Sequence, residues 1–185
     1  MATKATIFKV NLQIADMERN YYQDHVLTIA RHPSETDERM MVRLLVFGLH
    51  AGKYLEFGQG MTIDSEADLW QKDLTGAIEL WIDVGIPDDK LIRKACARSR
   101  QVIVYTYGGY VADAWFAKNI NKFERLKNLS VINFPMKDTR AIAKFAKRGM
   151  QLQCTIQDGQ IWLGDGNESV QVERISLKES IAGRC

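Results

Sequence analysis

The sequence from residue 73 to residue 107 constrains the fold most, because it predicts a strand, a short turn, a helix and a second strand in close succession. Residues 77–84 alternate strictly between the two faces of a strand. Every second side chain is aliphatic, and the side chains between them are Glu79, Trp81 and Asp83. Two carboxylates that flank a tryptophan, just before a helix rich in Lys and Arg, suit metal binding and phosphate handling.

Hydrophobic periodicity predicts a mixed α/β chain whose two ends are β and whose middle is α/β. The predicted strands are 6–15, 21–30, 54–58, 77–84, 102–107, 129–134, 151–157, 160–164 and 169–177, and the predicted helices are 34–51, 87–99, 110–121 and 138–149. Ser34 and Asp37 form a capping box that predicts the start of the first helix. Residues 65–72 fit a helical turn or part of a strand.

The length of 185 residues predicts one domain with a core of its own. We divide it into an N-terminal hairpin (1–31), a central α/β part (34–150) and a C-terminal β meander (151–178). We expect the β segments of the two ends to pair into one sheet beside the central part.

Charge is distributed unevenly along the chain, although the formal net charge is only +2. Basic residues cluster in the segments 90–100 and 118–148. Such clusters attract polyanions, including nucleic acid. A solvated helix face is the alternative interpretation, and the composition leaves both open.

The three cysteines, Cys96, Cys154 and Cys185, are widely spaced and lack a CxxC pattern. This spacing argues against a zinc finger and a disulfide framework and favours a reducing cytosol. No segment has the length of a membrane span, and the first residues lack the apolar run of a signal peptide. We therefore predict a cytoplasmic protein that does not enter the membrane. Walker A, dinucleotide-glycine and GxSxG motifs are absent from the sequence.

Three carboxylates are candidates for a metal site, with Asp73 as a weaker fourth that fits a turn better. Glu38 begins the apolar stripe of the helix 34–51, although a first-turn glutamate is also a common partner of the helix dipole. Glu79 and Asp83 lie about 13 Å apart on one strand, which is too far to share one ion. Each therefore needs partners from another element. Glu35, one turn before Glu38, fits a capping or surface position.

Five further side chains are candidates for charge stabilisation or substrate binding. Lys94 lies two turns into its helix and could lean back toward Asp83 to stabilise a developing charge, with a surface lysine as the alternative. Arg39 and Arg43 lie on a face next to Glu38 and could hold that carboxylate or a phosphate. The candidates for substrate binding are Arg39, Arg43, Arg98 and Tyr105.

The sequence resembles the YaeQ family over nearly the entire chain. The segments that carry the resemblance are ARHPSETDERMMVRLL (30–45), IELWIDVGIPDDKLIRKA (78–95), VIVYTY (102–107), NLSV (128–131) and LQCTIQDGQIWL (152–163). The family is regarded as a divergent branch of the PD-(D/E)XK nuclease-like superfamily. The resemblance implies a restriction-endonuclease-like αβββαβ core, with additional β hairpins from the N- and C-terminal segments. In that superfamily a helix glutamate, a strand aspartate and a (D/E)xK motif assemble around magnesium.

Carried over to this chain, the resemblance assigns Glu38 as the helix acid and Glu79 and Asp83 as the strand acids. The chain departs from the superfamily pattern after Asp83, because Val84-Gly85 replaces the residues that would contain the motif lysine. Lys94 is then the candidate replacement. The Pro-Asp pair is also absent, since Asp68 follows Ala67.

Two functions follow from the resemblance. The first is Mg²⁺-dependent hydrolysis of nucleic acid phosphodiesters, with Mg²⁺ held by the three acids. The second is a catalytically inactive nuclease-fold module that binds nucleic acid or a protein of the transcription machinery. The missing motif lysine favours the second.

Overall fold

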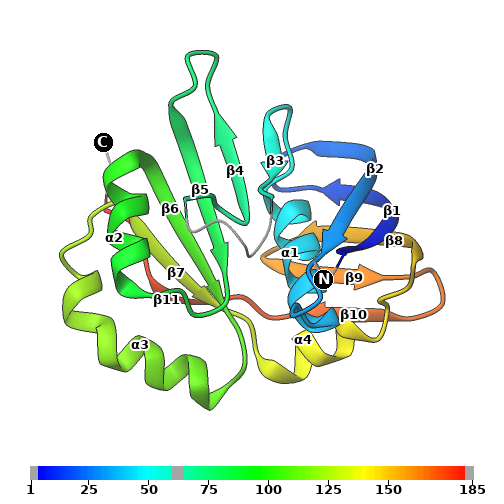
Figure 1. Cartoon of the computed structure of the whole chain (residues 1–185). Coiled ribbons are helices and arrows are strands. Elements are labelled where there is room, and N and C mark those ends of the chain that lie inside the picture. The colour runs from blue at the N-terminus through cyan, green and yellow to red at the C-terminus, as the bar shows by residue number, and fades with distance from the viewer. Residues whose placement is uncertain (1–3, 60–64, 182–185) are drawn as a thin grey trace. The chain divides into compact units, whose positions relative to one another are not determined.

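The computed structural model describes residues 4–59 and 65–181, which form eleven strands in two sheets and four helices (Figure 1). The strands are β1 (Thr6–Asp16), β2 (Tyr21–Arg31), β3 (Leu55–Phe57), β4 (Leu69–Lys72), β5 (Ile78–Val84), β6 (Ser99–Thr106), β7 (Leu129–Asn133), β8 (Gly149–Gln157), β9 (Gln160–Gly164), β10 (Ser169–Val172) and β11 (Ile175–Lys178). The helices are α1 (Asp37–His50), α2 (Asp89–Arg98), α3 (Tyr110–Phe123) and α4 (Met136–Ala143). None of these helices is long and apolar enough to span a membrane, within the described residues.

The chain divides into two compact units. Unit 1 comprises Met1–Ala51 and Lys137–Glu173, and unit 2 comprises Gly52–Met136 and Arg174–Cys185. The division differs from the three segments drawn from the sequence, because α1 and most of α4 belong with the terminal strands.

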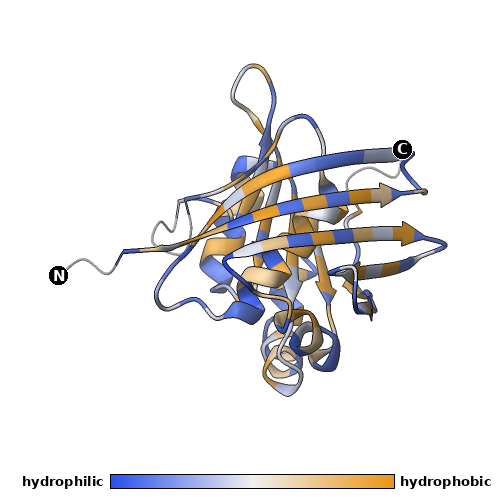
Figure 2. Ribbon diagram, turned by 90° about the vertical axis from the view of Figure 1, so that its right-hand side faces the viewer, coloured by the Kyte–Doolittle hydropathy of each residue, from blue (hydrophilic) through white to orange (hydrophobic). Residues whose placement is uncertain are grey.

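Unit 1 is built on a five-stranded sheet of order β10-β9-β8-β1-β2, in which only β1 and β8 are parallel. The prediction that the β segments of the two chain ends share one sheet is therefore confirmed for these strands. Hydrophobic and hydrophilic residues alternate along the strands (Figure 2), and α1 packs on the hydrophobic face. Gly48 permits this approach, because a Cβ there would lie 3.1 Å from Cys154 Sγ.

Unit 2 is built on a six-stranded sheet of order β11-β7-β6-β5-β4-β3. The three central strands β5, β6 and β7 are parallel, and the strands on either side pair antiparallel. Helices α2 and α3 cover one face. The core that they share with the sheet consists of Ala67, Trp81, Ile92, Ala95, Val102, Val104, Phe123, Leu129 and Val131.

Two predicted helix boundaries are wrong. Helix α1 begins at Asp37, because Thr36 is the N-cap and accepts a hydrogen bond from the Arg39 N–H at 3.1 Å. The Ser34 hydroxyl bonds His32 Nδ1 instead. Helix α4 ends at Ala143, where i→i−3 bonds such as Phe145 N–H to Ile142 O tighten the chain before β8 begins.

The predicted strand 169–177 is two strands that belong to different sheets. Strand β10 pairs with β9, and β11 pairs with β7. Between them, the Glu173 N–H donates to Asp138 Oδ2 at 3.0 Å, so this residue does not continue the strand pairing. Residues 69–72 of the undecided region form β4.

His25 connects the sheet of unit 1 to α1. Its ring lies 5.2 Å from the Phe47 ring in an edge-to-face contact, and Nε2 is 2.8 Å from the Tyr21 hydroxyl. Burial lowers the pKa of His25, and the nearby Asp24 carboxylate opposes this only in part. At mildly acidic pH, His25 therefore binds a proton more readily in the unfolded chain than in the folded chain.

The contribution of His25 to stability is expected to be retained above pH 6.5 and to be lost as the pH falls from 6.5 to the lowered pKa of the folded state, below which both states are protonated. The His25→Gln variant should lose part of this acid sensitivity, whereas Tyr21→Phe, which keeps the imidazole, should retain it. Urea unfolding at pH 7.5 and at pH values below 6 measures the difference. An unchanged pH slope in His25→Gln would contradict this assignment.

Candidate functional site

The face of β5 that carries the acidic residues is the face that α2 covers. Trp81 is only 4% exposed and packs with Ile92 and Ala95 of α2. It also meets Trp70 of β4 edge to face, with ring centroids 5.8 Å apart. The tryptophan is thus part of the core, as its cost in water predicts.

The two carboxylates of β5 are each engaged within unit 2. Trp81 Nε1 donates to Asp83 Oδ2 at 2.9 Å, and the Arg100 guanidinium pairs with Glu79 Oε2 at 3.1 Å. Both acids lie on the same face of the strand, as predicted, but their positions are four residues apart and their partners differ.

Asp68 is a further acid beside Asp83, and the sequence alone did not assign it a role. Leu69 of β4 pairs with Ile82 of β5, so Asp68, which immediately precedes β4, lies near the end of β5 that carries Asp83. Its Oδ2 accepts the buried Val84 N–H at 2.7 Å and so continues the ladder beyond the end of β4. The signal that identifies Asp68 is this strand pairing, which requires residues 69–72 to be recognised as a strand.

Helix α2 places the two basic candidates differently. Ile92 and Ala95 face the core, whereas Lys94 is exposed on another side of the helix. Arg98 returns toward the acidic strand, with its guanidinium carbon 5.6 Å from the centre of the Trp81 ring, and donates to Ser65 O at 3.3 Å.

Two further candidates of unit 2 have structural surroundings. Tyr105 of β6 is buried and stacks on Phe134 at 5.2 Å, and this burial raises the pKa of its hydroxyl. Asp73 closes the β4–β5 turn, where its carboxylate accepts the Thr75 hydroxyl at 2.6 Å and the Ala77 N–H at 3.0 Å. The hydrogen bond from Thr75 lowers the pKa of Asp73. The turn interpretation of Asp73 is confirmed.

In unit 1, Glu38 Oε1 accepts a hydrogen bond from the Thr139 hydroxyl of α4 at 2.7 Å. The nearby arginines contact a different acid. Arg43 Nε and Nη2 bind the two oxygens of Glu35, both at 2.7 Å, and Arg39 Nη1 reaches Glu35 Oε1 at 2.8 Å. Glu35 is 5% exposed, so its prediction as a capping or surface residue is wrong.

Within the part of the chain that the structure describes, no group of three or more His, Cys, Asp and Glu side chains is placed to hold a metal ion. The two carboxylates of unit 2 that best suit a metal ion are Asp68, just before β4, and Asp83, near the end of β5. Mg²⁺ accepts one or two carboxylates when waters and substrate phosphates complete its shell. A closed, all-protein metal centre does not fit these residues.

The cysteines of the described residues, Cys96 partly buried and Cys154 buried, do not suit nucleophilic chemistry. Burial raises the pKa of Cys96 to about 11 and that of Cys154 to about 12. Such thiols carry almost no thiolate at neutral pH. Cys185 lies outside the described residues.

A set of exposed basic side chains lies on α2 and α3 of unit 2 and is here called the basic helix surface. It consists of Lys90, Arg93, Lys94, Arg98, Lys118 and Lys122. Asp89 joins the two helices, because it pairs with Lys122 at 3.1 Å and with Arg93 at 3.6 Å. The hydrogen bond from Lys122 lowers the pKa of Asp89, which therefore stays ionised.

The fold and these residues define a mixed α/β protein with two sheets. The chain belongs to the YaeQ family, whose model, described as YaeQ protein, matches residues 1–174. Two relatives carry the description "Uncharacterized protein YaeQ". That of Escherichia coli (strain K12) is 42% identical over 172 residues, which cover 93% of this chain and 95% of the relative. That of Salmonella typhi is 40% identical over 173 residues, which cover 94% and 96%.

Solved structures of the family have the same fold. The crystal structure of the YaeQ protein from Xanthomonas axonopodis pv. citri matches with a TM-score of 0.90 at 46% identity, over 94% of this chain and 98% of that chain. The YaeQ protein from Pseudomonas syringae matches with a TM-score of 0.90 at 31% identity, over 96% and 98%.

Proposed function

We propose that this protein is a nuclease-fold module that binds the phosphate backbone of nucleic acid through the basic helix surface, without a need for metal. The observation that carries the proposal is a contrast within unit 2. The basic side chains of α2 and α3 are exposed, whereas the acids of β5 are engaged by Trp81 and Arg100. Exposed cations supply the sequence-independent part of nucleic acid binding.

The order of elements supports a nuclease-like core. Along the chain, α1 of unit 1 is followed by β3, β4 and β5 of unit 2 and then by α2 and β6, which is the αβββαβ succession that the resemblance implies. The strands β3 to β7 are neighbours in chain order, with antiparallel pairing up to β5 and parallel pairing after it. We also propose that the protein is cytoplasmic, as the cysteine pattern predicts.

Two features favour binding over catalysis. Gly85 occupies the place after β5 where the motif would have a lysine, and its φ of +109° is one that other residues rarely adopt. A side chain at this position would therefore strain the backbone. Lys94, the candidate replacement, is exposed among the other cations of α2, where it suits phosphate contact.

Removal of three exposed lysines of the basic helix surface tests the proposal. The triple variant Lys90→Gln, Lys94→Gln, Lys118→Gln should bind labelled duplex DNA more weakly, in EDTA as well as in Mg²⁺. The slope of log affinity against log salt should become shallower by about 2 to 3, since each phosphate contact contributes about 0.9. Fluorescence anisotropy at several salt concentrations measures both quantities, with single-stranded DNA and RNA run in parallel.

The matched control is Lys9→Gln, Lys144→Gln, Lys147→Gln, which removes three exposed lysines of unit 1. It should leave the salt slope unchanged. Equal weakening in both variants, or no binding by the wild type, would overturn the proposal. In the latter case a protein partner is the next candidate.

Mg²⁺-dependent hydrolysis is the second candidate function, and the neighbouring positions of Asp68 and Asp83 favour it. These two carboxylates would hold the ion, which would polarise the phosphate and activate water when bound. Cleavage of the same labelled DNA or RNA in Mg²⁺ or Mn²⁺, lost in both Asp68→Asn and Asp83→Asn, would replace the binding-only proposal by this one.

A further inference from the structure

The face of the unit 1 sheet that points away from α1 carries a grid of carboxamides. Strands β1 and β8 run parallel and in register, so Asn11 is opposite Gln151 and Gln13 is opposite Gln153. All four side chains are exposed. Adjacent strands lie about 4.8 Å apart, so the four amides form two neighbouring cross-strand pairs at the centre of the sheet.

Aromatic side chains border the next row of this grid. Tyr22 of β2 is opposite Ala15, Ala15 is opposite Thr155, and Thr155 is opposite Trp162 of β9. The two rings thus lie at either end of one row across four strands, about 14 Å apart at the strand spacing. Tyr22 is 57% and Trp162 is 37% exposed, and the small residues Ala15 and Thr155 lie between them.

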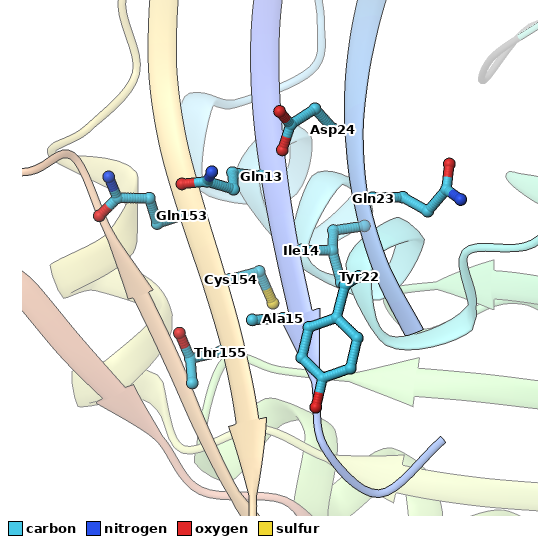
Figure 3. Close-up of a pocket in the computed structure, with 9 residues that line it drawn as sticks. All are labelled: Gln13, Ile14, Ala15, Tyr22, Gln23, Asp24, Gln153, Cys154 and Thr155. Carbon is cyan, nitrogen blue, oxygen red and sulfur yellow. The ribbon is translucent and has the colours of Figure 1, made fainter. Parts of the chain in front are cut away.

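This face is hollowed by shallow cavities that share residues. The largest, of about 560 Å³, is lined by Gln13, Tyr22, Asp24, Gln153 and Thr155 among others (Figure 3). A second, of about 350 Å³, continues from Gln13, Asp24 and Gln153. A third, of about 180 Å³, extends from Gln153 and Thr155 to Trp162. Together they form one groove, here called the amide groove.

The charge of the amide groove selects the kind of ligand. Among the described residues that line the three cavities, Asp24 and Glu168 are the only carboxylates, and no lysine or arginine occurs. A polyanion would find no cation here. The amide groove therefore suits a neutral, polar ligand and is independent of the nucleic acid surface proposed for unit 2.

The hydrogen-bonding chemistry points to hydroxyl groups. Each carboxamide offers donors and an acceptor on one planar group, and a hydroxyl is itself donor and acceptor. The Asp24 carboxylate accepts from a hydroxyl, and exposed aromatic rings such as Tyr22 and Trp162 pack against the apolar face of a ring-shaped ligand. We propose that the amide groove is a carbohydrate-binding site that takes a neutral oligosaccharide.

The test titrates the full-length protein with neutral oligomers of glucose, mannose and N-acetylglucosamine. Saturable calorimetric binding of at least one of them is expected, together with shifts of Asn and Gln side-chain amide resonances in NMR spectra. Gln13→Ala, Gln153→Ala and Trp162→Ala should each weaken binding about tenfold or more, which is the loss of one good contact. Gln101→Ala, an exposed amide of unit 2, is the matched control and should change nothing.

Three outcomes would overturn the proposal. One is the absence of saturable binding to all of these sugars. Another is binding that survives all three substitutions in variants whose thermal unfolding matches the wild type. The last is a concentration-dependent dimer that Gln13→Arg abolishes, which would assign this face to a second copy of the chain. None of these results depends on whether unit 2 binds nucleic acid.

Discussion

Replacement of Glu35 by alanine is expected to lower the free energy of unfolding by about 3–5 kcal/mol, the usual cost of breaking a buried ion pair. Arg43 is 2% exposed and binds both oxygens of Glu35 at 2.7 Å. The substitution removes this carboxylate and leaves a buried guanidinium charge uncompensated by it. Arg39, which also binds Glu35, loses the same partner.

Urea unfolding of the Glu35→Ala variant measures this loss. The control is Glu79→Ala, whose pair with Arg100 is largely exposed and should contribute no more than about 1 kcal/mol. A double variant, Glu35→Leu with Arg43→Met, should recover much of the stability, because it removes both buried charges and keeps the volume. A loss below 1 kcal/mol in Glu35→Ala would show that the pair is not needed for stability.

Replacement of Trp81 by alanine is expected to lower the free energy of unfolding by a similar amount, about 3–5 kcal/mol, because it opens a cavity in the core of unit 2. The ring packs against Trp70 and α2 and lies under the Arg98 guanidinium. The same change removes the indole N–H that binds Asp83. Chemical denaturation followed by far-ultraviolet circular dichroism avoids reliance on tryptophan fluorescence.

Two further variants separate packing from the hydrogen bond. Trp81→Phe keeps one aromatic ring in the core but removes the indole donor and part of the ring volume, and Asp83→Asn weakens the acceptor while keeping the whole indole. Each should cost about 0.5–1.5 kcal/mol, since Asp83 is partly accessible to water. If Trp81→Phe costs as much as Trp81→Ala, the hydrogen bond to Asp83 dominates and the packing argument is wrong.

The strand β5 illustrates how far sequence reasoning reaches. Its alternation predicted both its position and the common face of Glu79, Trp81 and Asp83, and the structure agrees on both. The pattern did not reveal that this face is covered by α2, or that the Trp81 indole and Arg100 engage its acids. Period-two alternation reports which side chains share a face, but not what packs on it.

The first helix shows the same limit. The apolar stripe predicts the helix and its end near Ala51. It also predicts Glu38 on the apolar face and Glu35 at a capping or surface position, and the prediction for Glu35 is wrong. In the sequence both acids lie close to the same arginines, Arg39 and Arg43, and the local pattern does not show which acid these arginines bind. Their partners differ because Glu35 meets Arg43, eight residues away, whereas Glu38 meets Thr139, which is 101 residues away.

The sequence by itself determined the type and approximate position of most strands and helices and the family resemblance of this protein, because alternation and apolar periodicity are properties of neighbouring residues. Tertiary structure decided the partners of its acids and the carboxamide grid on the unit 1 sheet. Asn11 and Gln13 meet Gln151 and Gln153 only because β1 and β8 pair across most of the chain. A local pattern carries no information about which distant strand becomes a neighbour, so the register that creates the amide groove emerges only in the folded chain.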